Sequence, residues 1–424
     1  MKILWITGTA SSKHKTYGGG GWIRSLSSRI VQSNEMELAW AYFYDADVNC
    51  FKRDEVWHYP MYLPEESRIG KLLRYWTGKG EKELEEKKVT LMKSVINQYQ
   101  PDIIQVFGTE SNGAFLIGKT EVPVVLYLQG LVNPIYNAYY PAGMTDEKVK
   151  AICKDKNEWI LNNGIVYRHK ELKRLAEREK WIFNEVKYVI GRTQFDNQIS
   201  RLYSPNSKYY KLNESMRSSF YCEEMWKKHK GTLYKIFSTM SSVTYKGLDV
   251  ILKTAKELKE NHVQFEWRIA GVTNPSKIIH LFERFTGIRA NEVNVICLGI
   301  LNENDLKRYL LDSDVYVHPS YIDNSPNSVG EAQLLGVPVV ACNVGGVSDF
   351  VKDGVTGKLV PANDPYDLAY LLMEDMRNPY LYKYSENTRL EAYKCHDRDA
   401  IFEDLCIIYK DVMAQEKKQS SKSK

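Results

Sequence analysis

Short apolar runs alternate with longer amphipathic stretches along almost the whole chain. The runs are rich in Val, Ile and aromatic residues and are bounded by turn residues, which is typical of strands buried on both faces. In the N-terminal half they predict strands at residues 3–8, 37–44, 102–107, 122–128 and 187–190. In the C-terminal half they predict strands at residues 235–239, 266–270, 293–298, 314–318, 337–341 and 358–360.

The stretches between these runs carry apolar residues at helical spacing. They predict helices at residues 22–31, 81–98, 170–184, 194–203, 246–260, 275–285, 303–311, 326–335 and 366–376. Buried strands that alternate with helices favour parallel sheets covered on both faces. We therefore expect an α/β protein with two doubly wound, Rossmann-like domains that face a central cleft.

The length of 424 residues favours two domains rather than one. We place the first domain at residues 1–212 and the second at 213–378, where 213–230 is a polar linker without clear periodicity. The segment 379–414 is helical in pattern and long enough to pack back on the first domain. The polar tail 415–424 is expected to be disordered.

Composition adds limits on location and partners. A net charge of +5 is too small to indicate nucleic-acid binding by itself. The opening apolar run is too short for a signal peptide, and no run has the roughly 18 apolar residues of a membrane span. The seven cysteines are scattered without CxxC spacing, which fits reduced thiols. These features favour the cytoplasm.

Basic residues stand beside aromatic ones in two stretches, Tyr167–Lys180 and Trp226–Lys230. One interpretation is a solvated helix face with charge pairs three or four residues apart. The other is a surface that contacts anionic lipid headgroups, which would place the protein peripherally on the inner face of the cell membrane.

The stretch from Tyr316 to Val360 has the most specific pattern. Pro326 suits the first turn of a helix, where its missing N–H costs nothing. Asn327 and Ser328 would then offer unpaired backbone N–H groups at a helix N-terminus, which is a natural site for a phosphate.

Two acidic residues flank this helix start. Glu331 lies one turn further along, where a carboxylate can accept hydrogen bonds from a vicinal diol such as a ribose. Asp323 lies in the preceding loop, near whatever the phosphates carry. Gly345 and Gly346 follow the next strand and permit close backbone approach.

This stretch resembles the donor-binding signature of glycosyltransferase family 4, whose members have the GT-B fold and transfer sugars with retention. The matching residues are Pro319-Ser320, Asp323, Glu331-Ala332, Gly336-Val337-Pro338-Val339-Val340 and Gly345-Gly346. The family usually has Glu where this chain has Asp323, so its reach is one methylene shorter. The resemblance implies that Glu331 binds the ribose and that Asp323 lies near the donor sugar.

Two further regions of the C-terminal half resemble the same family. Lys246, followed by glycine at the start of a predicted helix, is implied to lie near the donor diphosphate. Ser241 stands where the family usually has an arginine, so one of two diphosphate cations is missing. The backbone from Gly299 to Leu301 is implied to hold the nucleotide base.

The N-terminal half resembles the family at two places. Gly20 and Gly21, in a glycine run before a predicted helix, are implied to line the cleft near the donor phosphates and the acceptor. The run is a poor fit to the dinucleotide-binding glycine pattern. Gln129 stands where a histidine near the donor sugar is usual, and it can donate a hydrogen bond but cannot take up a proton.

We expect no metal site. The Asp-Ala-Asp of residues 45–47 and the Asp-Ser-Asp of 312–314 resemble metal-binding DxD motifs of another glycosyltransferase fold, but lack its surrounding pattern. His318, before Pro319 at a strand end, is interpreted as a packed structural histidine.

The resemblance implies a retaining glycosyltransferase that needs no cofactor. It would move a sugar from a nucleotide-diphosphate sugar, UDP- or GDP-linked, to a glycan or lipid-linked acceptor in surface polysaccharide or glycoconjugate synthesis. Residues 1–212 would bind the acceptor and 213–378 the donor, with Asp323, Lys246 and Gln129 as catalytic residues. The alternatives are a sugar-nucleotide epimerase of the same fold and a catalytically silent nucleotide-sugar-binding protein.

Overall fold

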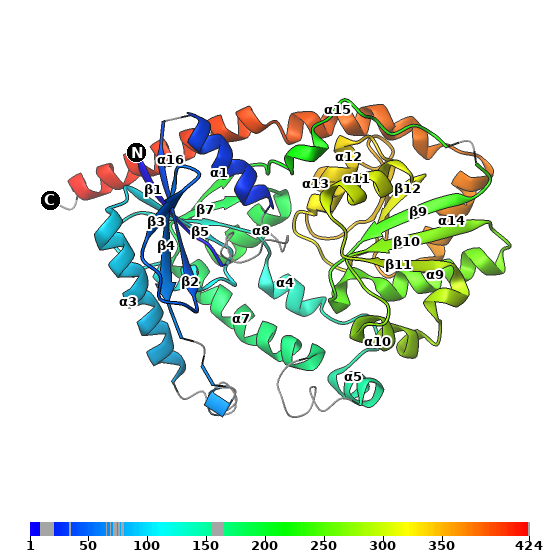
Figure 1. Cartoon of the computed structure of the whole chain (residues 1–424), viewed down its shortest axis with the longest axis horizontal. Helices are drawn as coiled ribbons and strands as arrows, with labels where there is room; N and C mark the ends of the chain where they lie inside the picture. Colours follow the sequence, from blue (N-terminus) through cyan, green and yellow to red (C-terminus); the bar gives the residue numbers. More distant parts are fainter. Residues whose placement is uncertain are drawn as a thin grey trace. The chain divides into compact units, whose positions relative to one another are not determined.

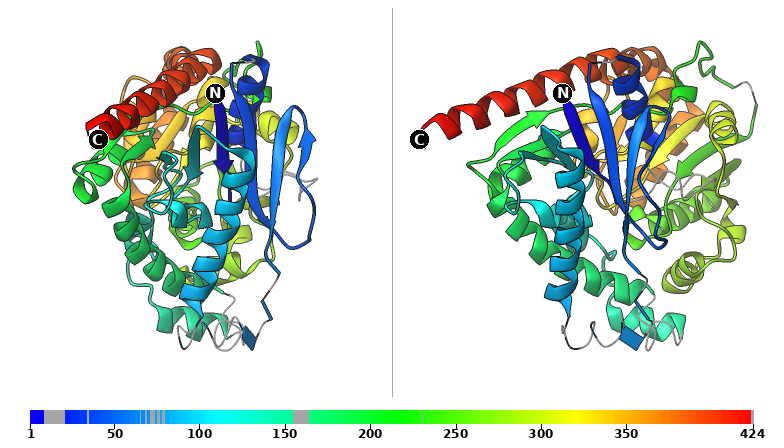
Figure 2. Two further views of the ribbon diagram at one scale, coloured as in Figure 1. Left: turned by 90° about the vertical axis from the view of Figure 1, so that its left-hand side faces the viewer. Right: turned by 60° about the vertical axis from the view of Figure 1, so that its left-hand side comes forward.

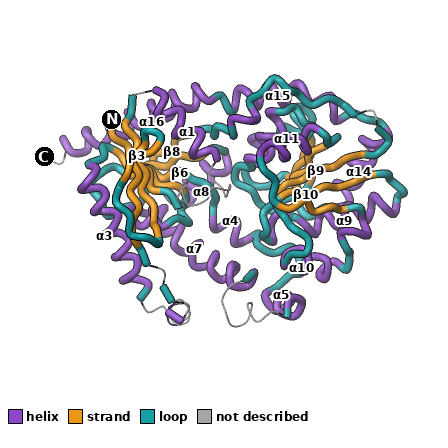
Figure 3. Tube along the Cα trace, in the orientation of Figure 1, coloured by secondary structure: helices purple, strands orange, loops and turns teal. Residues whose placement is uncertain are grey.

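A computed structural model describes residues 1–8, 21–33, 35–64, 66–67, 69–70, 74, 77, 80–154, 164–229 and 231–422. The chain forms two compact units, each built on one sheet (Figure 3). The N-terminal unit contains residues 1–132, 174–215 and 397–424, and the C-terminal unit contains 133–173 and 216–396.

The N-terminal unit has an eight-stranded sheet with the order β3-β4-β2-β1-β5-β6-β7-β8. Its strands are β1 (Lys2–Ile6), β2 (Glu37–Tyr44), β3 (Phe51–Arg53), β4 (Val56–Tyr62), β5 (Ile103–Phe107), β6 (Val124–Tyr127), β7 (Tyr188–Gly191) and β8 (Lys208–Lys211). The β3–β4 pair is antiparallel and the other pairs are parallel. The strand order reverses between β1 and β5.

The two faces of this sheet are covered by different helices (Figures 1 and 2). Ile3 and Trp5 of β1 pack with α1 (Gly21–Ser33) and α16 (Arg398–Lys422). The alternate residues Leu4 and Ile6 pack with α3 (Glu81–Tyr99) and with the end of α7 (Ile165–Glu185). Every β1 residue from Ile3 to Ile6 is thus buried, as its continuous apolar sequence predicts.

The C-terminal unit has a six-stranded, all-parallel sheet with the order β11-β10-β9-β12-β13-β14. Its strands are β9 (Tyr234–Thr239), β10 (Phe265–Ala270), β11 (Val295–Gly299), β12 (Val315–His318), β13 (Val339–Cys342) and β14 (Lys358–Val360). Its main helices are α9 (Leu248–Glu260), α10 (Lys277–Thr286), α11 (Glu303–Leu311), α12 (Asn327–Leu334), α14 (Pro365–Arg377) and α15 (Ser385–Cys395). The order reverses between β9 and β12.

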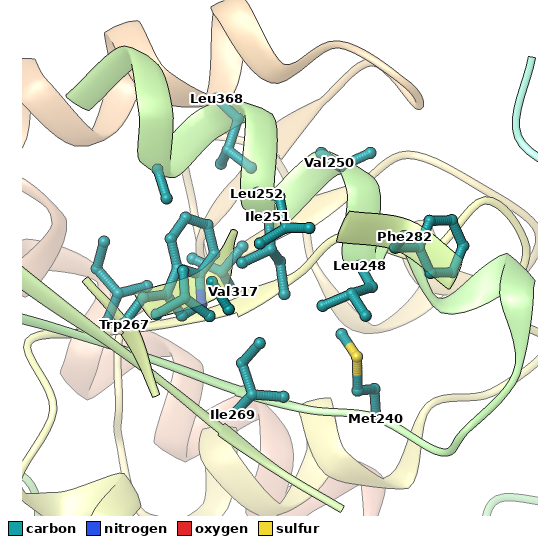
Figure 4. Close-up of a cluster of buried hydrophobic side chains, with 14 of the residues drawn as sticks. Met240, Leu248, Val250, Ile251, Leu252, Trp267, Ile269, Phe282, Val317 and Leu368 are labelled. Carbon is teal, nitrogen blue, oxygen red and sulfur yellow. The ribbon is translucent and has the colours of Figure 1, made fainter. Parts of the chain in front are cut away.

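One face of this sheet packs against α9, α10 and α14. In Figure 4, Trp267 and Ile269 of β10 lie in the same cluster as Leu248 and Ile251 of α9. The opposite face forms a second core with α11 and α12. The two helix layers hold the carboxyl ends of the strands in place, and ligands of such sheets bind beyond those ends.

The predicted strands and helices of both halves correspond to observed elements. Among the described residues, six observed strands and α-helices were not predicted, namely β3, β4, β8, α4 (Val132–Asn137), α5 (Asp146–Cys153) and α13 (Val347–Phe350). Pro60 lies inside β4, and a proline argues against a central strand because it cannot donate a ladder hydrogen bond.

The C-terminal segment 379–414, which the sequence predicted to be helical, contains two helices, because α15 ends at Cys395 and α16 begins at Arg398. Only the part from residue 397 on belongs to the N-terminal unit. Helix α16 continues to Lys422 where a disordered tail was expected, since Gln, Glu and Lys are good helix formers.

Candidate functional site

The candidate site of the C-terminal unit lies where its strand order reverses. β9 and β12 are parallel neighbours, so the loops that follow them leave the same edge of the sheet. Lys246 from the first loop and Asp323 from the second form an ion pair, with Nζ 2.5 Å from Oδ2. Two residues that are far apart in sequence are thus brought together at the expected ligand position.

Two glycines explain how closely these loops pack. Gly247 has φ +77°, and a Cβ there would lie 2.0 Å from the carbonyl oxygen of Pro319. Gly345 has φ +53°, and a Cβ there would lie 2.0 Å from the carbonyl oxygen of Asp323. The N–H of Gly346 donates to that same oxygen at 3.0 Å. The double glycine therefore fixes the loop that carries Asp323.

The environment of Asp323 keeps it ionised. Burial alone would raise the pKa of Asp323, but the Lys246 ammonium and His318 outweigh burial and hold it well below its usual range. His318 Nε2 lies 3.0 Å from Oδ2 of Asp323. Burial lowers the pKa of His318, against the opposing effect of Asp323. This buried imidazole fits its interpretation as a packed histidine.

The start of α12 lies beside this pair. Pro326 precedes the helix, and Asn327 and Ser328 are its first two residues, whose N–H groups have no acceptor within a helix. The Ser328 side chain hydrogen-bonds to Tyr316. The Asn327 Oδ1 atom is buried with no hydrogen-bond partner among the described residues. The backbone arrangement is suited to an anion.

Glu331 lies further along α12 and is paired with Arg217. The guanidinium donates from Nε to Oε1 at 2.5 Å and from Nη2 to Oε2 at 2.6 Å. Burial raises the pKa of Glu331, and Arg217 opposes that rise. Sequence reasoning missed Arg217 because it lies in the predicted linker, where nothing in the local pattern distinguishes it.

The remaining predicted donor residues of this unit lie at strand ends. Ser241 is exposed in the loop after β9. Gly299 ends β11, where it accepts from Gly271 N–H at 2.7 Å and donates to the Val272 carbonyl at 3.0 Å. Leu301 follows it and is half-buried. The backbone groups of Gly299 thus join two strand-end loops, and a role in holding the base remains a prediction.

In the N-terminal unit, the predicted residues are only partly described. Gly20 lies outside the described residues, and Gly21 is the first residue of α1. Gln129 follows β6 and is half-buried, and its carbonyl accepts from Arg192 Nη2 at 2.5 Å. Arg192 also pairs with the buried Glu214 at 2.5 Å. The role of the Gln129 side chain remains a prediction.

Two acidic residues that the sequence did not single out belong to, or contact, the loops after β5 and β6 of this unit. Glu179 Oε1 accepts from the Thr109 hydroxyl at 2.6 Å and from Val132 N–H at 2.8 Å, which ties together the loops after β5 and β6. Burial raises the pKa of Glu110 to about 7. Its Oε2 atom is buried without a hydrogen-bond partner within the described ranges. No sequence motif indicates either residue, because Glu179 is defined by contacts across the fold and Glu110 by its burial.

Of the two alternative metal motifs, the Asp-Ser-Asp of residues 312–314 has both of its carboxylates in contacts within its own unit. Asp312 pairs with Lys235 at 2.6 Å and with Arg268 at 2.7 Å. Asp314 accepts from the backbone N–H of Lys235 at 2.8 Å. Across the part of the chain that the structure describes, no group of three or more His, Cys, Asp or Glu side chains could hold a metal ion.

The two basic and aromatic stretches differ in exposure. On α7 the exposed residues are mostly basic, and they include Arg168, Lys170, Lys173, Arg174, Lys180 and Trp181. In the second stretch Trp226 is buried, and its indole N–H donates to the Ser313 carbonyl at 2.6 Å. Trp226 is therefore a core residue rather than a surface anchor. Among the described residues, no helix combines the length and apolarity that crossing a bilayer requires.

Comparison with known proteins identifies one family model and several relatives that match part of the chain. Residues 223–394 match the model of the family Glycosyl transferases group 1. A putative colanic acid biosynthesis glycosyltransferase of Salmonella typhimurium is 29% identical over 157 residues, which are 35% of this chain and 38% of that protein. An amylovoran biosynthesis glycosyltransferase of Erwinia amylovora is 26% identical over 147 residues, or 33% and 35% of the two chains. The chain thus matches little more than a third of the length of these relatives, whose names agree with the predicted enzyme class.

Solved structures resemble the whole chain. Sucrose-phosphate synthase from Thermosynechococcus elongatus superposes with a TM-score of 0.71 at 16% identity, covering 98% of this chain and 99% of that one. Anabaena HepE in complex with UDP-glucose gives a TM-score of 0.60 at 14% identity, covering 97% and 100%. At such identities the likeness concerns the fold alone. The predicted fold class, an α/β protein of the GT-B type with two Rossmann-like domains, is confirmed.

Proposed function

We propose that the protein is a retaining glycosyltransferase that takes its sugar from a UDP- or GDP-linked donor. The acceptor is a glycan or a lipid-linked saccharide, and the setting is surface polysaccharide or glycoconjugate synthesis. The observation that carries the proposal is the convergence of Lys246, Asp323 and the start of α12 at the strand reversal of the C-terminal sheet. The family match over residues 223–394 supports the same conclusion.

In this proposal, different protein groups bind the diphosphate, the ribose, the base and the sugar of the donor. The N–H groups at the start of α12 and the Lys246 ammonium stabilise the diphosphate, whose negative charge grows as it leaves. Glu331 accepts hydrogen bonds from the ribose hydroxyls. The backbone from Gly299 to Leu301 holds the base, and Asp323 lies near the transferred sugar.

The proposed reaction exchanges one bond at the anomeric carbon for another. The bond to the diphosphate oxygen breaks, and a bond to the acceptor hydroxyl oxygen forms on the same face of the sugar. The acceptor proton passes to the departing phosphate oxygen, so no side-chain nucleophile is needed. The roles of Gln129, Gly20 and Gly21 in this reaction remain predictions from the resemblance.

We also propose peripheral contact with anionic membrane on the cytoplasmic side. The basic exposed residues of α7 support this location, because each Lys or Arg near an anionic surface contributes about 1 kcal/mol. The second stretch contributes less than its sequence suggested, since Trp226 is buried.

The function is tested by a thermal-shift screen with nucleotide-diphosphate sugars, followed by a donor-hydrolysis assay with the best ligand. A ligand that binds only the folded state raises the melting temperature. We expect a UDP- or GDP-sugar to stabilise the protein and to be slowly hydrolysed. Stabilisation without hydrolysis or transfer would favour the catalytically silent binding protein, and no stabilisation by any nucleotide sugar would count against the proposal.

A further inference from the structure

Arg217 makes a two-point contact with Glu331 in the interior of the C-terminal unit. Its Nε and Nη2 atoms lie 2.5 and 2.6 Å from the two carboxylate oxygens. The side chains are 10% and 7% exposed, so the pair is almost fully removed from water. A bidentate contact of this kind fixes the plane of the carboxylate as well as its position.

Arg217 is itself held by the core. Its guanidinium carbon lies 4.9 Å from the centre of the buried Phe220 ring. The preceding residue, Met216, donates its N–H to the Tyr221 hydroxyl at 2.8 Å, and that hydroxyl donates to the His396 carbonyl at 2.7 Å. The guanidinium is therefore preorganised, because the segment that carries it is anchored on both sides.

The charge of Arg217 determines the state of Glu331. A carboxylate that is buried without a cation takes up a proton rather than remain charged. Burial does raise the pKa of Glu331, and the nearby Glu303 acts in the same direction, while Arg217 opposes both. A protonated carboxyl offers fewer acceptor positions, whereas an ionised one has about four lone-pair sites.

We propose that Arg217 is a positioning residue for nucleotide-sugar binding, which orients the Glu331 carboxylate and keeps it ionised. The guanidinium occupies one lone pair on each oxygen, so the remaining lone pairs stay available to the two hydroxyls of a ribose. This inference rests on the proposed function, in which Glu331 binds the ribose. Arg217 itself acts only through Glu331.

The test measures binding of UDP and GDP by calorimetry between pH 7 and pH 9. It compares the wild type with Arg217→Met and Arg217→Lys, and repeats Arg217→Met in a Glu331→Gln background. Arg217→Met should weaken binding about 10–100-fold at pH 7, as loss of a partner that orients a liganding group commonly does. The loss should shrink as the pH rises and Glu331 ionises, and Arg217→Lys should show a smaller loss because it keeps the charge but not the fork.

In the Glu331→Gln background, Arg217→Met should cause no further loss of affinity, since the residue it acts through is already neutral. Tighter binding by Arg217→Met would mean that the arginine competes with the ribose, which overturns the proposal. An equal loss in both backgrounds would overturn it too. If Arg217→Met does not fold, as judged by its thermal melt, Arg217→Lys must bind UDP or GDP more weakly than the wild type and must cause no further loss in the Glu331→Gln background.

The failure of this inference can be told apart from failure of the proposed function. If the wild type binds UDP or GDP and Arg217→Met binds equally well, only the role of Arg217 is wrong. If the wild type binds no nucleoside diphosphate, the proposed function fails and the role of Arg217 fails with it.

Discussion

The two units differ in the side chains that connect the loops after their central strands. In the C-terminal unit, the loops after β9 and β12 bring together charged side chains that a local sequence motif contains. In the N-terminal unit, the loops after β5 and β6 are tied together by Glu179, which accepts from Thr109 and Val132. The first arrangement is visible in sequence because it repeats a pattern shared with a family. The second has no local sequence pattern and becomes visible only in the fold.

The largest effect should come from the donor side of this comparison. Lys246→Ala removes a cation beside the growing charge of the leaving group and should reduce turnover roughly 10²–10³-fold. Donor affinity should fall less, because the interaction is stronger in the transition state than in the ground state. Steady-state kinetics measure both. Lys256→Ala is the matched control, since Lys256 is an exposed lysine of α9, the helix that follows Lys246.

If Lys246→Ala retained most of its turnover, other residues would have to hold the diphosphate. The two units would then no longer differ in the way described, because the paired charges of the C-terminal unit would be structural as well.

In the N-terminal unit, Glu110→Gln should change how the free energy of unfolding depends on pH. Its pKa is about 7 in the folded protein, raised by burial from a model-peptide value of 4.5. A carboxyl whose pKa is higher in the folded state makes its full contribution to folding stability at pH values below its unfolded-state pKa. That contribution is lost as the pH rises through about 7. Glu110→Gln should therefore be more stable than the wild type at pH 8, by up to about 3 kcal/mol, and this advantage should vanish near pH 5.

Urea unfolding at pH 5 and pH 8 measures the difference. Glu177→Gln is a suitable control, because Glu177 is an exposed residue of α7 in the same unit. A Glu110→Gln protein that gains no stability at pH 8 would show that the buried carboxylate finds a partner, and the contrast with the well-paired acids of the C-terminal unit would disappear.

The sequence predicted most of the fold for a clear physical reason. Strands buried on both faces must be apolar throughout, and the helices between them must be amphipathic, so both leave strong periodic signals. The missed elements are those without that signal, such as β4 with its internal Pro60 and the short β3. The return of α16 to the N-terminal unit was only a possibility in the sequence, because a helix does not specify its packing partner.

The candidate site was predicted unevenly. Asp323, Glu331 and Lys246 belong to motifs whose spacing is fixed by one loop or one helix turn. Arg217 contacts Glu331 across 114 residues of sequence, and Glu110 is defined by burial alone. Neither relation has a local pattern, so a single sequence contains no sign of it.

A smaller effect is expected from Ser241→Arg, which tests whether the loop after β9 faces the donor. Ser241 is exposed in the loop after β9, so a longer side chain can be accommodated there. An arginine would add a cation near the diphosphate, and turnover should stay the same or rise up to about tenfold, which corresponds to roughly 1.4 kcal/mol. Kinetics with the preferred donor measure this, and abolished turnover would mean that the loop does not face the donor.

The smallest effect concerns α7. Binding to anionic vesicles should fall steeply between low and physiological salt, because the attraction is screened over about 10 Å at 0.1 M. Replacing Lys170 and Lys173 by Gln should weaken vesicle binding by about 1 kcal/mol for each charge removed. Equal binding to neutral and anionic vesicles would leave the basic face of α7 as an ordinary solvated surface.

The central claim is that the C-terminal unit binds a nucleotide sugar through Glu331. Calorimetric titration of the preferred UDP- or GDP-sugar into the wild type, Glu331→Gln and Glu386→Gln tests it most directly. Glu386 is an exposed residue of α15 in the same unit and serves as the control. We expect Glu331→Gln to lose most of its donor affinity while it keeps its fold, and Glu386→Gln to bind as the wild type does. Unchanged donor affinity in Glu331→Gln would contradict the account.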